Sequence, residues 1–485
     1  MDEARNADAT RRDLVMALRI MNTLGRRMQK FVPLKKKTVR MYTCGPTVWD
    51  YAHIGNFRTY VFQDILRRYL EYKGYKVIQV TNITDVDDKT IRQSKATGVS
   101  LREYTKKYEE AYFEDIAALN IEKAERYPRA TEHINEMVAL VKRLVRKGLA
   151  YEAEGSVYFD ISKFKTYGKL SGMRLEQLKS GARIDSDEYG KDEARDFVLW
   201  KGWRPEDGEV FWETALGKGR PGWHIECSAM SMKYLGATFD IHSGGEDLIF
   251  PHHENEIAQS EAATGKRFVR YWLHSGMLLV GGRKMAKSLG NFFTLRDLLS
   301  KGHDPLALRY LLMSAHYRAP LNFTEEALGD ATKAIQALRE TLRRVKTFTA
   351  TTKRDNVELQ KLLSREQLEF ERAMDDDLNM PRALAALHRI ARAVNRAIDQ
   401  CKISGEDAKA THRLVSRLDK VLGIFAEQMK ADFLPREAEL LIRERDEARA
   451  KRDWATADKL REQLSAMGIL VEDTPTGTVW KRRPR

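Results

Sequence analysis

The sequence predicts an α/β protein with a parallel sheet, followed by a helical region and a small C-terminal module. Three observations predict this class. A strand, a helix and a second strand follow one another within residues 39–84, the same alternation returns within residues 223–274, and the apolar pattern becomes helical beyond about residue 300. Strands that alternate with helices form βαβ units, whose strands lie parallel in one sheet. Because residues 141–220 separate the two stretches, the sheet is expected to be split in sequence.

The first stretch begins with an apolar strand at residues 39–42. The loop CGPTVWDYAHIGN follows and leads into a helix with one apolar face, which ends at Gly74. Residues 76–84, with the sequence KVIQVTNIT, predict the next strand. This order is typical of a nucleotide-binding α/β domain.

The middle of the chain breaks this alternation. Its glycines, tryptophans and short strand-like pieces, such as residues 156–160, predict a β-rich insertion. The second half of the sheet follows it, with a helix at 223–235, a strand at 239–242, a helix at 252–264 and a strand at 268–274.

The C-terminal part of the chain is predicted to be helical. Asn379 and Pro381 mark a helix start, and one helix is predicted over residues 436–467 with Trp454 on its inward face. Residues 469–480 predict a strand, a turn and a second strand. These last elements indicate a small separate module.

Composition narrows the class of protein. With 485 residues, the chain is long enough for roughly three or four folding units. The net charge of +14 favours a polyanionic partner such as RNA, DNA or an anionic lipid, although a basic surface without a partner is the alternative. The mean hydropathy of -0.53 excludes an integral membrane protein. Three cysteines make a disulfide framework implausible, and the polar N-terminus lacks a signal peptide, so a cytoplasmic location is expected.

Two short motifs could hold phosphate groups. His53-Ile54-Gly55-Asn56 lies at a strand-to-helix turn, where backbone N–H groups and the helix dipole attract anions. The segment Lys284-Met285-Ala286-Lys287-Ser288 presents two lysines after a glycine pair. A structural turn and a solvated charge run are the alternatives, but the two motifs support each other.

A third group of residues could bind a metal. Cys44, Cys227, His252 and Glu256 combine the donor types that Zn²⁺ accepts, and the last two face one side of a predicted helix. Their separation over more than 200 residues leaves the metal open at this point. His253 does not begin a zinc-protease HExxH motif, because Ile257 stands where the second histidine is needed. The stretch GKGRPG has the glycine spacing of a dinucleotide-binding loop. It is not expected to form one, because it contains Pro221 and lies at the end of the insertion.

Several long stretches resemble one family in the same order along the chain. HIGN and KMAKS are similar to the paired signatures of class I aminoacyl-tRNA synthetases. Within that class, the chain from about Leu18 onward resembles cysteinyl-tRNA synthetases, in the stretches MYTCGPTVWDYAHIGN, NITDVDDK, GRPGWHIECSAMS, FDIHSGGEDLIFPHHENEIAQS, AMDDDLNMPRAL and GILVEDTPTGTVWKRR.

The resemblance implies a Rossmann-type parallel-sheet catalytic domain split by a connective insertion, then an α-helical bundle and a small C-terminal anticodon-binding module. The expected parts are a polar N-terminal extension at 1–17, catalytic halves at 18–140 and 221–300, a connective insertion at 141–220, a stem-contact region at 301–345, a helical bundle at 346–435 and an anticodon-binding module at 436–485.

The resemblance also implies roles for particular residues. It implies metal ligands at Cys44, Cys227, His252 and Glu256, and catalytic, ATP-binding residues at His53, Asn56, Lys284 and Lys287. Substrate-binding residues are expected at Thr84, Trp223, His242 and Asp247, and tRNA-binding residues at Arg449, Trp454, Asp458 and Asp473, with packing as the alternative for each pocket residue and for Trp454. Asn56 stands where the class has His and Ala286 where it has Ser, which leaves the phosphate contacts open.

The implied enzyme is a cysteine–tRNA ligase that is ATP-dependent and AMP-forming. It would form cysteinyl-adenylate and pyrophosphate from L-cysteine and ATP, and then transfer cysteine to the 3′-terminal adenosine of tRNA(Cys). One Zn²⁺ per chain and Mg²⁺ with ATP are the expected cofactors, with zinc selecting a thiolate against the serine hydroxyl. A monomer is expected. The alternatives are a mycothiol-pathway cysteine ligase, which lacks a comparable tRNA-reading end, and a catalytically silent RNA-binding paralogue.

Overall fold

The computed structural model describes residues 17–173, 183–184, 195–285, 289–347, 352, 354–425, 436–474 and 477–482. The chain divides into two compact units, Met1–Lys333 with Glu369–Leu384, and Ala334–Leu368 with Ala385–Arg485. Among the described residues, no helix combines the length and the apolar character that crossing a bilayer requires.

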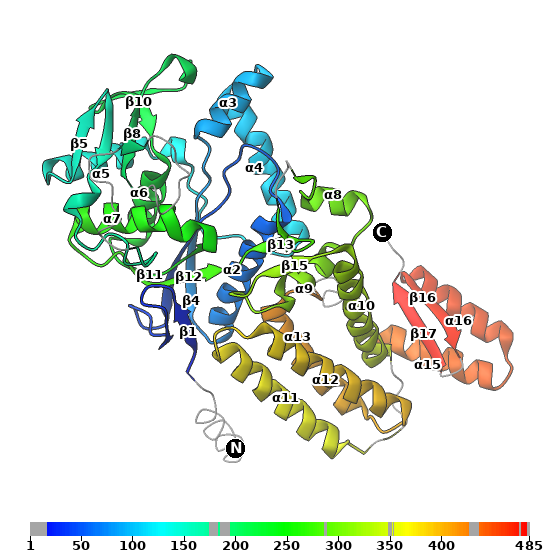
Figure 1. Ribbon diagram of the computed structural model, residues 1–485. Helices are drawn as coiled ribbons and strands as arrows, with labels where there is room; N and C mark the ends of the chain where they lie inside the picture. Colours follow the sequence, from blue (N-terminus) through cyan, green and yellow to red (C-terminus); the bar gives the residue numbers. More distant parts are fainter. Residues whose placement is uncertain are drawn as a thin grey trace. The chain divides into compact units, whose positions relative to one another are not determined.

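A parallel sheet forms the centre of the first unit (Figure 1). Its strands in spatial order are β12 (Val269–Ser275), β11 (Phe239–Gly245), β3 (Thr38–Thr43) and β4 (Lys76–Thr81). The first predicted stretch supplies β3 and β4, and the second supplies β11 and β12. The α/β class and the split of the sheet are therefore confirmed, although β4 ends before residue 84 and β11 continues beyond residue 242.

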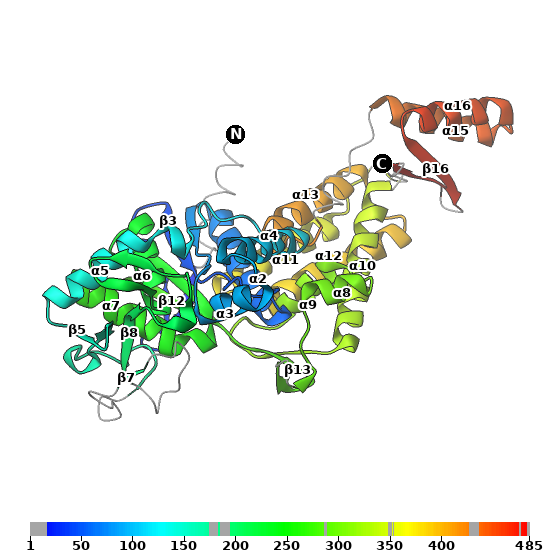
Figure 2. The same ribbon diagram turned by 90° about the horizontal axis from the view of Figure 1, so that it is seen from above.

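Helices cover both faces of this sheet (Figure 2). Helix α2 (Ile54–Tyr72) lies on one side, and α6 (Trp223–Leu235) and α7 (Glu254–Thr264) lie on the other. The connections β3–α2–β4 and β11–α7–β12 lead away from each other, so the strand order reverses between β3 and β11. In α/β sheets, ligands bind at such a reversal, outside the carboxyl ends of the strands.

Helices α6 and α7 are fixed to the sheet by a buried apolar cluster. It includes Tyr42 and Trp272 from the strands, Cys227 from α6 and Ile257 from α7. Burying each large apolar side chain contributes about 1.5–3 kcal/mol. This packing holds the backbone of both helices firmly beside the ends of the strands.

The segment between the two halves of the sheet contains helices and a second sheet, which is antiparallel except for the parallel pairing of β7 with β8. The helices are α3 (Asp88–Thr97), α4 (Leu101–Ala118) and α5 (Ile134–Arg146). The strands in spatial order are β5 (Ala150–Ala153), β6 (Ser156–Phe159), β8 (Asp196–Gly202), β10 (Gly217–Pro221) and β9 (Trp212–Thr214), with β7 (Arg183–Ile184) beside β8. Strand β6 confirms the strand predicted near residues 156–160.

Small elements flank the parallel sheet. Strands β1 (Arg19–Asn22) and β2 (Arg27–Lys30) form a hairpin at the start of the described chain. After β12, strand β13 (Leu278–Val280) pairs with β14 (Arg283–Lys284) and with β15 (Leu321–Phe323), and the helices α8 (Leu295–Ser300) and α9 (Pro305–Ser314) lie between β14 and β15 in sequence. Gly281 and Gly282 have φ values of 58° and 74°, which favour glycine at this turn.

The rest of the chain is mainly helical. Its elements are α10 (Glu325–Thr347), α11 (Val357–Asp375), α12 (Met380–Asp399), α13 (Gly405–Leu422), α15 (Arg436–Ala450), α16 (Trp454–Ala466), β16 (Ile469–Thr474) and β17 (Gly477–Arg482). Helix α12 confirms the start predicted from Asn379 and Pro381, and β16 and β17 confirm the predicted strand pair.

The prediction of one helix over residues 436–467 is wrong. The chain forms α15 and α16 with a break between them, where Arg452 has a φ of 61°. Asp453 then begins α16 as its N-cap, because its carboxylate accepts a hydrogen bond from the Thr456 N–H at 3.1 Å. A periodic apolar pattern continued across this break, which hid it in the sequence.

Candidate active site

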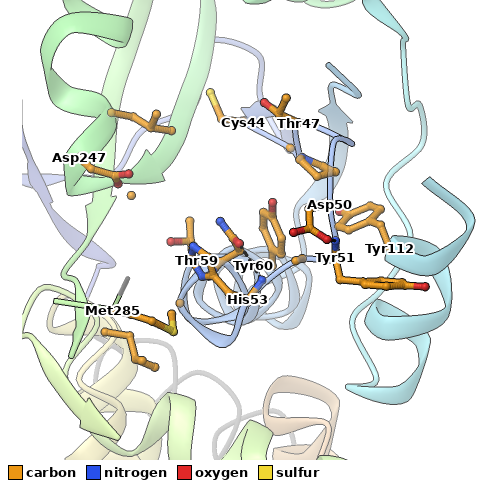
Figure 3. Close-up of a pocket in the computed structure, with 18 of the residues that line it drawn as sticks. Cys44, Thr47, Asp50, Tyr51, His53, Thr59, Tyr60, Tyr112, Asp247 and Met285 are labelled. Carbon is orange, nitrogen blue, oxygen red and sulfur yellow. Dashed lines mark hydrogen bonds between the residues drawn. The ribbon is translucent and has the colours of Figure 1, made fainter. Parts of the chain in front are cut away.

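A cavity of about 380 Å³ lies at the carboxyl ends of β3, β11 and β12, where the strand order reverses (Figure 3). Its wall is built by the loop after β3, the first turns of α2, parts of α3 and α4, and the segment around β13 and β14. Among the lining residues are Cys44, His53, Asn56, Trp223, Asp247, Lys284 and Met285.

The four predicted metal ligands lie together beside this cavity. Cys44 follows β3, Cys227 lies in α6, His252 in the kinked segment Ile249–His253 before α7, and Glu256 in α7. Their ligand atoms all lie within 4.8 Å of one another, and the four residues are buried. The parallel pairing of β3 with β11 brings Cys44 to the three others.

The chemistry of this cluster fits a metal cation. Burial raises the pKa of Glu256 to about 8 and raises the pKa values of both thiols, while it lowers the pKa of His252 to about 4. Oε1 of Glu256 is buried and accepts no well-aligned hydrogen bond among the described residues, although His252 Nε2 lies 3.2 Å from it. Two thiols, an imidazole and a carboxylate at this spacing are donors that Zn²⁺ accepts.

Further histidines surround the ligands. His242 Nε2 lies 2.9 Å from Oε2 of Glu256, and His253 Nε2 lies 3.2 Å from the Cys44 sulfur. His253 Nδ1 is 2.7 Å from His274 Nε2, and His274 Nδ1 is 2.7 Å from the Thr23 hydroxyl. Thr23, His274 and His253 thus form a chain of contacts that runs from the residue after β1 to the sulfur of Cys44. We call these three residues the histidine chain.

Sequence reasoning missed the histidine chain. The sequence shows His253 only beside a predicted ligand and in an incomplete protease motif, and no motif contains His274 or Thr23. The position of His253 directly after a predicted ligand was an available signal. The ligand atoms of Cys44, His242, His253 and Glu256 also lie within 4.8 Å of one another. Both histidines therefore lie close to Cys44 and Glu256, which belong to the predicted ligand set as well.

The predicted substrate-binding residues fall into two groups. Trp223 and Asp247 line the cavity, and the Trp223 ring lies 4.2 Å from the His252 ring, measured between centroids. Thr84 and His242 do not line it but are buried behind its wall. There the Thr84 hydroxyl donates to Oε2 of Glu226 at 2.9 Å.

The predicted phosphate motifs meet at the cavity. His53 is the N-cap of α2: the Asn56 N–H donates to His53 Nδ1, the His53 N–H donates to Asn56 Oδ1, and both distances are 3.1 Å. The asparagine side chain therefore closes a capping box, which gives a structural reason for it at this position. Lys284 is exposed on β14 and lines the cavity, while Lys287 lies outside the described residues.

Three of the four predicted tRNA-binding residues lie together in the second unit. Arg449 forms an ion pair with Asp473 at 3.1 Å, and its guanidinium lies 5.5 Å from the centroid of the Trp454 ring. Asp458 is exposed on α16. The prediction that Trp454 faces inward is wrong, because 55% of it is exposed. Trp454 is the first residue of α16, whose buried residues, Ala457, Leu460 and Leu464, come later in the helix.

Family models match most of the chain. One described as the tRNA synthetases class I (C) catalytic domain matches residues 30–333. A DALR domain matches residues 369–426, and a cysteinyl-tRNA ligase anticodon binding domain matches residues 431–480. The first model covers the parallel sheet and its insertion, the second covers α12 and α13, and the third covers α15, α16 and the last strand pair.

Curated relatives match over nearly their whole length. A cysteine–tRNA ligase of Thermococcus onnurineus is 47% identical over 479 residues, covering 96% of this chain and 99% of the relative. One of Solibacter usitatus is 48% identical, covering 96% of this chain and all of the relative. Among solved structures, a Mycobacterium tuberculosis methionyl-tRNA synthetase in complex with methionyl-adenylate has a TM-score of 0.58 at 16% identity, covering 80% of this chain and 90% of that one, and thus shares the fold. The chain therefore belongs to the cysteine–tRNA ligase family of class I aminoacyl-tRNA synthetases.

Proposed function

We propose that this chain activates L-cysteine with ATP in the 380 Å³ cavity and transfers it to tRNA(Cys). The observation that carries the proposal is the convergence of Cys44, Cys227, His252 and Glu256 beside the start of α2, in a member of this family. A site that can bind a thiol and a helix N-terminus that can bind phosphate therefore lie at the same cavity.

The proposed resident metal is Zn²⁺, held by the four clustered residues. When bound, zinc would supply a Lewis acid that prefers the thiolate of cysteine to the hydroxyl of serine. The protein holds the donors by burial and through His242 and His253, which contact Glu256 and Cys44. A hydrophobic pocket alone discriminates poorly between groups of such similar size.

Other residues would orient the amino acid. Asp247 lines the cavity and offers a carboxylate to the substrate ammonium group. Trp223 lines it as well, and its ring packs against His252, so it can exclude water from the sulfur end. In this placement the carboxylate of cysteine points toward His53 and Asn56.

The start of α2 and the signature lysines would bind ATP, which enters with Mg²⁺. A cysteine carboxylate oxygen attacks the α-phosphorus, the bond to the β-phosphate oxygen breaks, and pyrophosphate leaves. Charge that develops on the phosphates is stabilised by the N-terminal end of α2, by Lys284 and by Lys287. In the second step, the 2′-hydroxyl of the terminal adenosine attacks the carbonyl carbon, AMP leaves, and the hydroxyl proton is released.

The remaining parts of the chain would bind tRNA. We assign residues 301–345 to the acceptor stem and residues 436–485 to the anticodon, with Arg449, Trp454 and Asp473 at the bases. The exposed ring of Trp454 offers a stacking face to an unpaired base. A cytoplasmic monomer is the proposed state.

Zinc analysis and the two half-reactions test the proposal together. The purified chain should contain one zinc and catalyse cysteine-dependent exchange of pyrophosphate into ATP. Cys227→Ser should lose zinc and the preference for cysteine over serine, whereas Cys401→Ser, which changes an exposed cysteine of the second unit, should keep both. Full selectivity in a zinc-free Cys227→Ser protein would refute the role of the metal.

The acceptor is tested separately. A tRNA(Cys) transcript and an amino sugar of the mycothiol type are offered to the enzyme with ATP and radiolabelled cysteine. Transfer to the tRNA alone supports the proposal, and transfer to the sugar alone would establish the alternative ligase. No exchange of pyrophosphate at all would point to a silent paralogue.

A further inference from the structure

The cavity has a second end, to which the proposed binding of ATP gives no role. Figure 3 shows Met285 and Asp247 on one side of His53, and Tyr51 and Tyr112 on the other. The ends of β11 and β12 and the strand β14 border the first side, where the signature lysine Lys284 lies. The loop after β3 and the helices α3 and α4 border the second side.

Aromatic rings gather at this second end. Trp49, Tyr51 and Tyr108 line the cavity, and each is partly exposed. The Tyr51 and Tyr108 rings meet edge to face with centroids 5.1 Å apart. The Tyr104 hydroxyl donates to the backbone oxygen of Trp49 at 2.7 Å, which ties the loop to α4. The rings are therefore held in place before any ligand binds.

Cations lie over these rings. Lys89 Nζ lies 5.7 Å from the centroid of the Trp49 ring, Lys107 Nζ lies 5.1 Å from that of Tyr108, and the Arg296 guanidinium lies 5.0 Å from that of Tyr51. We call these three rings and three cations the aromatic rim. Arg296 is paired with Glu114 at 2.6 Å. Lys107 is exposed, and in the described part of the chain it forms no ion pair, so its charge is available to an anion.

Ring faces beside exposed cations are suited to single-stranded nucleic acid. Bases of any sequence stack on the rings, and the backbone phosphates meet the cations. The net charge of +14 agrees with a polyanion as the ligand.

We propose that the aromatic rim binds the nucleotide that precedes the terminal adenosine of the tRNA, with its base stacked on Tyr108 beside Tyr51 and its phosphate at Lys107. This inference rests on the proposed function, because the terminal ribose must reach the adenylate beside His53. When that ribose lies in the cavity, the preceding nucleotide lies at an opening of it. The rim occupies the end of the cavity that lies away from Lys284.

The test compares the two half-reactions in full-length Lys107→Ala and Tyr108→Leu proteins. Pyrophosphate exchange measures adenylate formation, and single-turnover transfer from preformed adenylate measures the use of tRNA. We expect the ratio of transfer to exchange to fall about tenfold in each variant, as for the loss of one base-stacking contact in Tyr108→Leu and of one charged hydrogen bond to the phosphate in Lys107→Ala. Lys106→Ala is the matched control, because Lys106 is on the same helix, is 70% exposed and pairs with Glu110, and it should keep the wild-type ratio.

A modified tRNA identifies the nucleotide. In a tRNA that lacks only the base before the terminal adenosine, transfer by the wild-type enzyme should be slow, and Tyr108→Leu should slow it no further. An equal further loss with this tRNA would overturn the assignment. A raised KM for ATP in the exchange reaction would also overturn it, because the rim would then serve ATP. Failure of wild-type exchange itself would instead count against the proposed function.

Discussion

Removing the imidazole of His253 is expected to weaken zinc binding, although none of the four predicted ligands is mutated. If Cys44 binds zinc as a thiolate, its sulfur can only accept, so His253 must donate through Nε2. His253 Nδ1 then accepts from His274 Nε2–H, and His274 Nδ1 accepts from the Thr23 hydroxyl. The histidine chain therefore has one direction, from Thr23 to the sulfur. Outer hydrogen bonds of this kind orient ligands and tune affinity.

The size of the effect follows from the bonds that are lost. A hydrogen bond to a charged group contributes about 1.5–3 kcal/mol, so His253→Leu should weaken zinc binding about 10- to 150-fold. Thr23→Val removes only the last neutral hydrogen bond, worth about 0.5–1.5 kcal/mol, so its effect should be about 2- to 12-fold. Thr23→Ser keeps the hydroxyl and should keep the affinity.

Competition with a chelator at fixed pH measures these affinities directly, without relying on the activity of the enzyme. The expected order of zinc affinity is wild type and Thr23→Ser, then Thr23→Val, then His253→Leu. Equal affinities for wild type and His253→Leu would refute the reasoning. A loss in Thr23→Ser as large as that in Thr23→Val would show that the hydroxyl is not the relevant group.

Three further predictions concern stability and tRNA. Arg309→Met should lower the free energy of unfolding by about 3–5 kcal/mol in urea titrations, because it removes a partner of the buried Asp64 carboxylate; an unchanged midpoint would contradict this. Burial alone would raise the pKa of Asp64, but Arg309 and Arg68 lower it below the unfolded value of about 3.9. The stabilisation should therefore be present above about pH 4 and be lost as the pH falls further, a dependence that should be weaker in Asp64→Asn unfolded in parallel. Trp454→Ala should change stability by less than about 0.5 kcal/mol, since the ring is 55% exposed, but should lower aminoacylation with tRNA about tenfold at unchanged pyrophosphate exchange.

Much of the fold could be predicted from local patterns. Helix α6 has the predicted bounds, and β3, β11 and β12 lie within a few residues of theirs, because apolar periodicity and terminal glycines act locally. The break at Arg452 escaped prediction. Neither glycine nor proline marks it, and the residue adopts a left-handed φ that its type rarely takes.

The candidate site was less accessible to sequence reasoning. The ligand set came from matching long motifs, since residues 44 and 256 become neighbours only through the pairing of β3 with β11. Contacts made by non-motif residues were missed, as for Thr23 with His274 and for Lys107 over Tyr108. Such contacts depend on the packing of distant elements, which no local spacing records. Likewise, the burial of Thr84 behind the cavity wall is a property of the folded chain alone.

The split of the sheet also sets an order of events during synthesis. One thiol leaves the ribosome with the first half of the sheet, and the other three donors follow after the whole intervening segment. At elongation rates of about 5–20 residues per second, Glu256 is synthesised about ten to forty seconds after Cys44. Until Cys227 follows, Cys44 has no second thiol beside it and is open to oxidants and to other metal ions. If the proposed zinc binds, its capture is thus a late step of folding, because all four donors are available only once both halves of the sheet have been synthesised.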